Sequence, residues 1–279
     1  MNQLDSILRR NWDILVILDA CRYDYFARVA SEYFPGRRVR KVISPASNTY
    51  EWAKKVLEPY DWGDVVYISA NPWINSKTSI RDLDLRTNFA SIYDAWLYDW
   101  DTEKNTVWPD KLTDRALWFM RQHEDKKFII HYIQPHAPYL SLNLEQSSPF
   151  PLTGGNLGQE KTALQRIEDK LIYEYLPRPL FRTFLRWRMK KGLRIGGPEF
   201  VAFASLSLEE WRKAYVENLK MALNAVRKLL RHLEHKRVVI TADHGELLGD
   251  RLFFGHKVGH PAFVHYLELV EVPWLEVKT

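Results

Sequence analysis

Four short segments of this chain are apolar at nearly every position, and each is followed by polar residues. They are residues 13–18 (DILVIL), 65–70 (VVYISA), 127–133 (KFIIHYI) and 238–241 (VVIT). Continuous apolar runs of this length are typical of strands buried on both faces, as in parallel sheets covered by helices on both sides. The four runs therefore predict a buried and mostly parallel sheet.

Segments with a helical pattern alternate with these runs. We expect helices at residues 23–34, 48–57, 111–124 and 207–233, and further strands at residues 37–44 and 272–277. Ser47 is predicted to be the N-cap of the second helix, and Ser207 with Glu210 forms a capping box for the last. A three-layer α/β/α fold with a doubly wound, mostly parallel sheet accounts best for this order.

The length of 279 residues fits one large domain, and we expect a single domain over residues 1–279 with an insertion or lid around 140–205. Within that insertion, residues 177–194 are basic and carry apolar residues at helical spacing. Two interpretations are open: an interfacial helix in peripheral contact with an anionic membrane, or a solvated basic face packed on the domain. The net charge of +5 favours anionic partners mildly.

The cellular location is expected to be cytoplasmic, with peripheral membrane contact as an option. The only cysteine, Cys21, excludes a disulfide framework and suits a reducing compartment. The first residues are too polar for a secretory signal, and no stretch approaches the roughly 20 apolar residues that span a bilayer.

Ligand-capable residues follow four of the predicted strands. Asp19, Ser47, His136 and the pair Asp243-His244 stand at these ends. A parallel sheet gathers such ends at one edge, so residues more than two hundred positions apart can meet there. Carboxylates with an imidazole and without thiolates suit Zn²⁺, Mn²⁺ or Mg²⁺. Taken alone, Asp19 could be a turn residue, Ser47 a helix cap and His136 a loop histidine.

A serine at a helix N-terminus beside a metal has two routes to activation, since the metal lowers the pKa of the hydroxyl and the helix amides stabilise negative charge. The same groups would hold the oxygens of a phosphoryl or sulfuryl group during displacement. His136 and His256 could contact the ester or protonate the leaving group.

These residues carry a resemblance to the sulfatase-like branch of the alkaline phosphatase superfamily, which includes sulfatases, phosphonate monoester hydrolases and phosphoglycerol transferases. ITADHGELLGDRLFFGHKVGHPAF with VPWLEV resembles the Asp-His-Gly-Glu, Gly-His and Val-Pro pattern of that branch. FIIHYIQPHAPY resembles its substrate-contacting histidine segment, and ILVILDACRYD its first metal-binding strand.

The resemblance implies an alkaline phosphatase-like fold and a divalent metal ion, such as Mn, Zn, Mg or Ca. Its ligands would be Asp19, Asp243 and His244, completed by the nucleophile. Ser47 occupies the nucleophile position most closely, and Thr49 is the alternative. His136 and His256 match substrate-contacting positions. One metal ion is favoured over two, because the sequence lacks the second aspartate of sulfatases and the second zinc motif of phosphodiesterases, although His256 or His260 could complete a second site.

The expected function is that of a metal-dependent phosphoesterase or phosphotransferase acting through a covalent intermediate. Neither the proline nor the arginine that sulfatases need for formylglycine conversion follows Ser47, which disfavours the alternative of a sulfatase. A third interpretation is a family member without catalysis that binds a membrane or a protein partner. The expected substrate is an anionic phosphate or sulfate ester, lipid- or sugar-linked if some of the eleven tryptophans line its pocket. We expect no nucleic acid.

Overall fold

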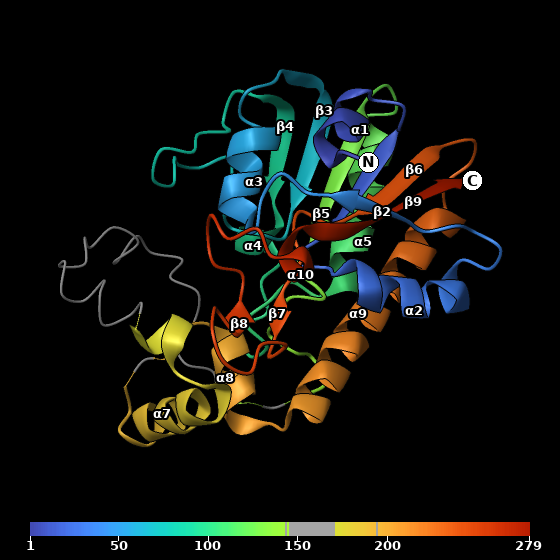
Figure 1. Ribbon diagram of the computed structural model, residues 1–279. Coiled ribbons are helices and arrows are strands. Elements are labelled where there is room, and N and C mark those ends of the chain that lie inside the picture. The colour runs from blue at the N-terminus through green and yellow to red at the C-terminus, as the bar shows by residue number, and fades with distance from the viewer. Residues whose placement is uncertain (143, 145–170, 194) are drawn as a thin grey trace.

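A seven-stranded sheet forms the centre of the molecule in this computed structural model, which describes residues 1–142, 144, 171–193 and 195–279 (Figure 1). The strand order is β2-β9-β6-β1-β5-β3-β4. The bounds are β1 Ile14–Leu18, β2 Arg40–Ile43, β3 Trp62–Ser69, β4 Phe89–Asp94, β5 Lys127–Tyr132, β6 Arg237–Thr241 and β9 Glu271–Lys278.

The four apolar runs form the parallel centre of this sheet. β1 is buried at every position and lies between β5 and β6, with Ile17 opposite both His131 and Thr241. β5 pairs in parallel with β3, and β3 with β4. β9 runs antiparallel to β6, and β2 antiparallel to β9. The carboxyl ends of β1, β3, β5 and β6 therefore meet at one edge.

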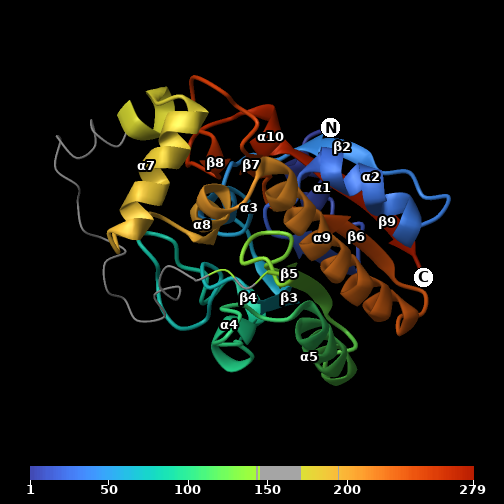
Figure 2. The ribbon, with the colours of Figure 1, turned by 90° about the horizontal axis from the view of Figure 1, so that it is seen from below.

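Helices cover both faces of the sheet (Figures 1 and 2). On one face α2 and α5 pack against the long α9, and on the other α3 lies beside α1, where the indole of Trp52 donates to the amide oxygen of Gln3. Their bounds are α1 Gln3–Leu8, α2 Tyr23–Tyr33, α3 Thr49–Val56, α5 Pro109–Gln122 and α9 Leu208–Arg231. The predicted three-layer α/β/α class is confirmed.

The predicted cap of α3 was wrong by one residue. Asn48 is the N-cap, since its side-chain oxygen accepts a hydrogen bond from the amide of Glu51 at 2.9 Å. The hydroxyl of Ser47 instead donates to the carbonyl of Pro261 at 2.7 Å. The capping box of Ser207 and Glu210 at the start of α9 is confirmed.

Two elements lie within residues 71–108, where the sequence shows no clear pattern. They are the edge strand β4 and the short helix α4, Ala95–Tyr98. Because only the first and last residues of β4 are buried, it lacks the continuous apolar run that marks the central strands.

The predicted insertion is described in part. After residues 143 and 145–170, which lie outside the described residues, come the π-helical turn η1 Leu171–Tyr175, α7 Arg178–Lys190 and α8 Pro198–Ser205. α7 packs on α8, and α8 contacts α9 and β8 (Figures 1 and 2). The last elements are β7 Leu247–Leu248, β8 Val258–Gly259 and α10 Leu267–Val270. None of the helices in the described residues combines the length and the apolarity needed to cross a bilayer.

Candidate metal and nucleophile site

Three buried side chains meet at the carboxyl edge of the sheet. Asp19 follows β1, Asp243 follows β6, and His131 stands near the end of β5. One ligand atom from each lies within 4.8 Å of the other two, and this group could hold a metal ion. The prediction from the sequence included Asp19 and Asp243 but missed His131, whose only signal is a polar residue inside an otherwise apolar strand.

Thr49 lies in the same group. As the first residue of α3, it donates from Oγ1 to Oδ2 of Asp243 at 2.7 Å, and its Oγ1 lies 3.3 Å from Nε2 of His244. The hydroxyl of Ser47, although buried, faces the carbonyl of Pro261 and the carboxylate of Glu51. The structure therefore brings Thr49 to the predicted ligands, whereas the hydroxyl of Ser47 has other partners.

The orientation of His244 is fixed by its own backbone. Its Nδ1 lies 2.7 Å from the carbonyl of Gly245, and because a carbonyl can only accept, Nδ1 carries the proton and Nε2 keeps its lone pair. That Nε2 lies 3.4 Å from Oδ1 of Asp19 and 3.4 Å from Oδ2 of Asp243. Lone pairs from both carboxylates and the imidazole thus converge on one point.

Two atoms of this group have no hydrogen-bond partner among the described residues. They are Oδ1 of Asp19 and Nε2 of His131, and both are buried. Nδ1 of His131 lies 2.8 Å from the hydroxyl of Tyr67, so when Nδ1 donates, Nε2 presents its lone pair toward Asp243. Buried polar atoms are almost always satisfied. A divalent cation would satisfy both, and a set of two carboxylates, imidazole and hydroxyl suits one.

Electrostatics favour a cation at the same point. Burial and the charge of Asp243 raise the pKa of Asp19 well above its usual value. Burial also acts to raise the pKa of Asp243, but the neighbouring His244 and His131 outweigh it and lower that pKa. Two carboxylates in one dry site repel each other, and a positive ion between them would remove that cost.

Asn71 is a second site residue that sequence reasoning missed. It follows β3 and donates from Nδ2 to Oδ2 of Asp19 at 2.7 Å, with Oγ1 of Thr49 at 3.4 Å from the same nitrogen. The amide thus holds Asp19 so that its other oxygen faces the group. An Asn-Pro dipeptide after a strand is typical of a turn, so the sequence around Asn71 carries no separate signal for a site.

A pair of histidines lies beside this group. Nε2 of His136 is 3.0 Å from Nε2 of His260, whose ring lies 4.7 Å from the ring of His244. Burial acts to lower the pKa of His136, but the carboxylates of Glu246 and Glu199 outweigh it and raise that pKa. Burial and the neighbouring histidines lower the pKa of His260 well below its usual value. His136 is therefore the member of the pair that carries the proton.

His256, also predicted for this site, lies elsewhere. Its Nε2 is 3.5 Å from the carboxylate of Glu174, which precedes α7. Of the two histidines in residues 253–263 (FFGHKVGHPAF), the structure places His260 beside His136, and His256 beside the insertion.

Steric contacts explain why a glycine, Gly245, follows Asp243 and His244. A Cβ built at this position would lie 2.1 Å from the carbonyl oxygen of Glu268, and the amide of Gly245 donates to the carbonyl of Leu269 at 2.7 Å. The close approach of the segment before β9 therefore requires glycine here, and it fixes the backbone that carries Asp243 and His244.

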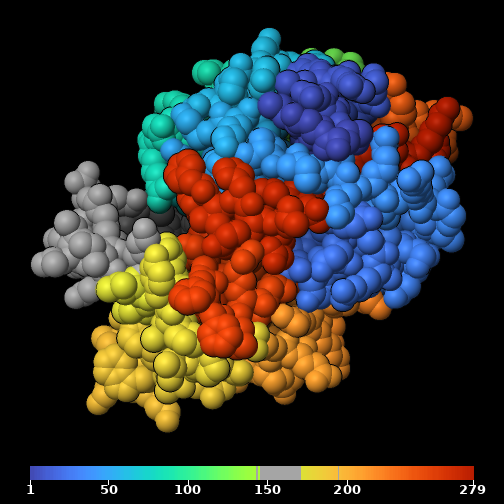
Figure 3. Space-filling model, viewed as in Figure 1, coloured from blue at the N-terminus to red at the C-terminus, as the bar shows by residue number. Residues whose placement is uncertain are grey.

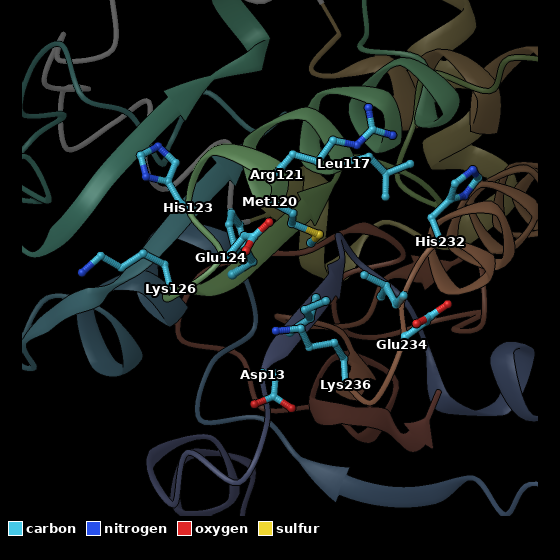
Figure 4. A pocket seen from close by; sticks show the side chains of 13 residues that line it. Asp13, Leu117, Met120, Arg121, His123, Glu124, Lys126, His232, Glu234 and Lys236 are labelled. Carbon is cyan, nitrogen blue, oxygen red and sulfur yellow. The ribbon is translucent and has the colours of Figure 1, made fainter.

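A pocket of about 600 Å³ lies at the opposite edge of the sheet (Figure 4). It is lined by residues at the amino ends of the strands, among them Asp13, Phe128 and Lys236, and by the ends of α5 and α9. Its side chains do not include any of the ligands described above, so it is not part of this site.

Comparisons with known proteins bear on the fold. A scan against models of protein families finds no match, and neither does a search of curated protein sequences. Among solved structures, a protein of the alkaline phosphatase superfamily from Vibrio parahaemolyticus matches with a TM-score of 0.50 and 10% identity, over 96% of this chain and 60% of that one. The chain has the alkaline phosphatase fold.

Two further solved structures are similar to this chain in fold. The C-terminal periplasmic domain of EcEptC from Escherichia coli, in complex with zinc, matches with a TM-score of 0.55 and 12% identity, over 95% of this chain and 72% of that one. A 2-O GAG sulfatase matches with a TM-score of 0.51 and 12% identity, over 95% of this chain and 64% of that one. The predicted alkaline phosphatase-like fold is confirmed, and the structures that share it include a sulfatase and a periplasmic EptC domain.

Proposed function

We propose that the protein is a metal-dependent hydrolase or transferase of phosphate esters, with Thr49 as its nucleophile. The observation that carries the proposal is the position of the Thr49 hydroxyl, 2.7 Å from Asp243 and 3.3 Å from His244 at the N-terminus of α3. Asp19, Asp243, His244 and His131 would hold one divalent cation. When bound, that cation would lower the pKa of the Thr49 hydroxyl and offset the charge of the ester.

The residues of the chain supply the other parts of the reaction. Asp243 accepts the proton of Thr49, whose oxygen then forms a bond to phosphorus as the bond to the leaving oxygen breaks. The first amides of α3 favour the negative charge that develops there. Protonated His136, with His260 beside it, is placed to bind a non-bridging oxygen or to protonate the leaving oxygen. Water or an acceptor alcohol then displaces Thr49 from phosphorus.

Phosphate is favoured over sulfate by the residue at the nucleophile position. Formylglycine forms from cysteine or serine, and the hydroxyl that lies among the ligands belongs to a threonine. The only cysteine, Cys21, is buried and makes a weak contact with the carbonyl of Arg22. An unmodified hydroxyl suits phosphoryl transfer.

The substrate class is part of the proposal. The structures that share the fold include the soluble domain of a lipooligosaccharide phosphoethanolamine transferase from Neisseria meningitidis and a 2-O GAG sulfatase. We therefore propose an anionic ester on a lipid or a sugar. The cytoplasmic location stays a prediction.

Aryl phosphate monoesters, aryl phosphodiesters and an aryl sulfate, each assayed with Mn²⁺, Zn²⁺ or Mg²⁺, test this function. We expect metal-dependent release of phenol from a phosphate ester and, after acid quench, a phosphoryl adduct on the peptide that contains Thr49. Turnover of the sulfate alone, or an adduct on Ser47, would refute the assignment.

A further inference from the structure

The surface beside the site carries exposed apolar side chains next to a run of basic residues. α7 has two apolar faces: Phe181 and Leu185 are buried, while Leu180 and Trp187 are exposed. Leu180, Phe184 and Trp187 are spaced by four and three residues and so lie on one side of the helix, where the rings of Phe184 and Trp187 stack. The buried face packs α7 on the domain, and Phe184 is partly buried against the same core, so Leu180 and Trp187 are the apolar side chains of this face that remain exposed.

A neighbouring loop extends this apolar surface. Phe253 and Phe254 are 58% and 74% exposed, and Leu252 is exposed as well. The loop is fixed to the start of α7, because the amide of Arg178 donates to the carbonyl of Leu252 at 2.8 Å and the rings of Tyr175 and Phe254 are in contact. Figure 3 shows the two segments side by side.

The charges carried by residues 178–193 are all positive, and Glu210 of α9 lies near Arg182. Residues 178–193 contain Arg178, Arg182, Arg186, Arg188, Lys190 and Lys191 and no acidic residue. Arg178 donates to the carbonyl of Gly249, and Arg182 and Arg186 donate to the carbonyl of Ala204. A carbonyl does not neutralise a guanidinium, so these charges remain. Burial, together with the repulsion of Arg186 and Arg178, lowers the pKa of Arg182.

We propose that this docking surface (Tyr175, Leu180, Trp187, Leu252, Phe253 and Phe254, with the cations of α7) binds an anionic lipid bilayer. Leucine and aromatic side chains that project from a helix and a loop can enter the interface of a bilayer, while lysine and arginine contact its anionic headgroups. An acidic protein surface would match the positive charge, but it would not provide an apolar environment for the exposed leucine and aromatic side chains.

Docking on this surface would bring the ester site close to the headgroups. The loop that carries Phe253 and Phe254 continues through Lys257 to His260, which contacts His136. Lys257 donates to the carbonyls of Tyr173 and Glu174 ahead of α7, so the loop and the insertion are joined at two points. The surface and the wall of the site therefore belong to one connected segment.

Co-sedimentation with vesicles tests this proposal independently of catalysis. We expect the full chain to bind vesicles of phosphatidylcholine with phosphatidylserine or phosphatidylglycerol, and to bind pure phosphatidylcholine at least tenfold more weakly. Lys190→Glu with Lys191→Glu, or Trp187→Ser with Phe254→Ser, should each weaken binding at least tenfold, and higher salt should weaken binding of the unaltered chain.

Matched controls are available on the far side of the molecule. Trp118 is 51% exposed, as is Trp187, so Trp118→Ser should bind vesicles as the unaltered chain does. Arg121→Glu with Arg231→Glu reverses two exposed charges away from α7 and should have a much smaller effect. Asp243→Asn should also keep full binding, which separates docking from the proposed function. Absence of binding to anionic vesicles at low salt, or equal loss in the Trp118 control, would overturn the proposal.

Discussion

The hydroxyl of Thr49 lies 2.7 Å from the carboxylate of Asp243, although 194 positions separate the two residues along the chain. One stands at the start of α3 and the other at the end of β6. Their contact joins the positive end of a helix to the carboxyl edge of the sheet, and the proposed chemistry depends on it.

Replacing Thr49 should abolish turnover. Thr49→Ala removes the proposed nucleophile and should lower kcat about 10³-fold or more, while Thr49→Ser should keep measurable activity because the hydroxyl remains. Ser47→Ala is the matched control. It should keep kcat close to the unaltered value and lose about 1–3 kcal/mol of stability, since the carbonyl of Pro261 loses its donor. Steady-state kinetics and denaturant unfolding of the variants distinguish Thr49 from Ser47 as the nucleophile. A Ser47→Ala variant that folds normally but is inactive would contradict the assignment of Thr49.

His131 should act as a metal ligand, and His256 should not. His131→Phe removes a buried Nε2 that faces Asp243, so bound metal should fall at least tenfold in elemental analysis or calorimetric titration. His256→Ala should retain the full metal content, because His256 faces Glu174 instead. Equal metal content in both variants would count against the ligand set.

Asp19→Asn should stabilise the metal-free protein against unfolding and abolish the further stabilisation that a bound metal gives. The amide oxygen of the new residue can still accept from Asn71, while the repulsion between two buried carboxylates disappears, a gain on the order of 1 kcal/mol. In the unaltered protein, metal at one hundred times its Kd should add about 2.7 kcal/mol, and a chelator should reverse this. Thermal unfolding with and without chelator measures both effects.

Glu199 should make stability fall as the pH rises. Burial raises its pKa above the usual 4.5, although His136 opposes the shift, so the folded chain keeps a proton that the unfolded chain releases. Below about pH 4.5 Glu199 is protonated in both the folded and the unfolded chain, and its contribution to the free energy of unfolding is fully present. Between that pH and the pKa of the folded chain, the free energy of unfolding falls by at most about 1.4 kcal/mol per pH unit. Glu199→Gln should show a flatter profile of urea midpoint against pH than the unaltered chain. An identical profile would show that Glu199 titrates normally.

Gly245→Ala should impair folding. The added Cβ would lie 2.1 Å from the carbonyl oxygen of Glu268, so the segment before β9 must move or the Asp243-His244 turn must distort. We expect a loss of more than about 3 kcal/mol, at the upper end of overpacking effects. Gly192→Ala is a useful comparison, because no atom of the described residues lies within 4 Å of a Cβ at this position and only the positive φ opposes the change. Urea unfolding of both variants isolates the steric part.

The central sheet could be predicted because its strands are buried on both faces and so read as apolar runs. Asp19, Asp243 and His244 followed from the same logic, as residues that stand directly after such runs. His131 could not be identified in the same way, because it lies inside β5 and does not follow it. At such a position the sequence does not distinguish a histidine that packs in the core from one that binds a metal. The choice between Ser47 and Thr49 depended on where α3 begins, and a two-residue difference at a helix start is beyond what capping preferences resolve.

The position of β1 has a consequence for protein synthesis. β1 pairs with β5 on one side and with β6 on the other, and these strands lie more than a hundred and more than two hundred residues further along the chain. A nascent chain cannot form the centre of its sheet until residue 241 has left the ribosome, and Asp19 has no Asp243 beside it before then. Such long-range pairing slows folding and leaves one side of β1 unpaired until β6 has been synthesised. Chaperones that bind extended apolar segments should therefore associate with the growing chain through β1, and release it only when β6 arrives.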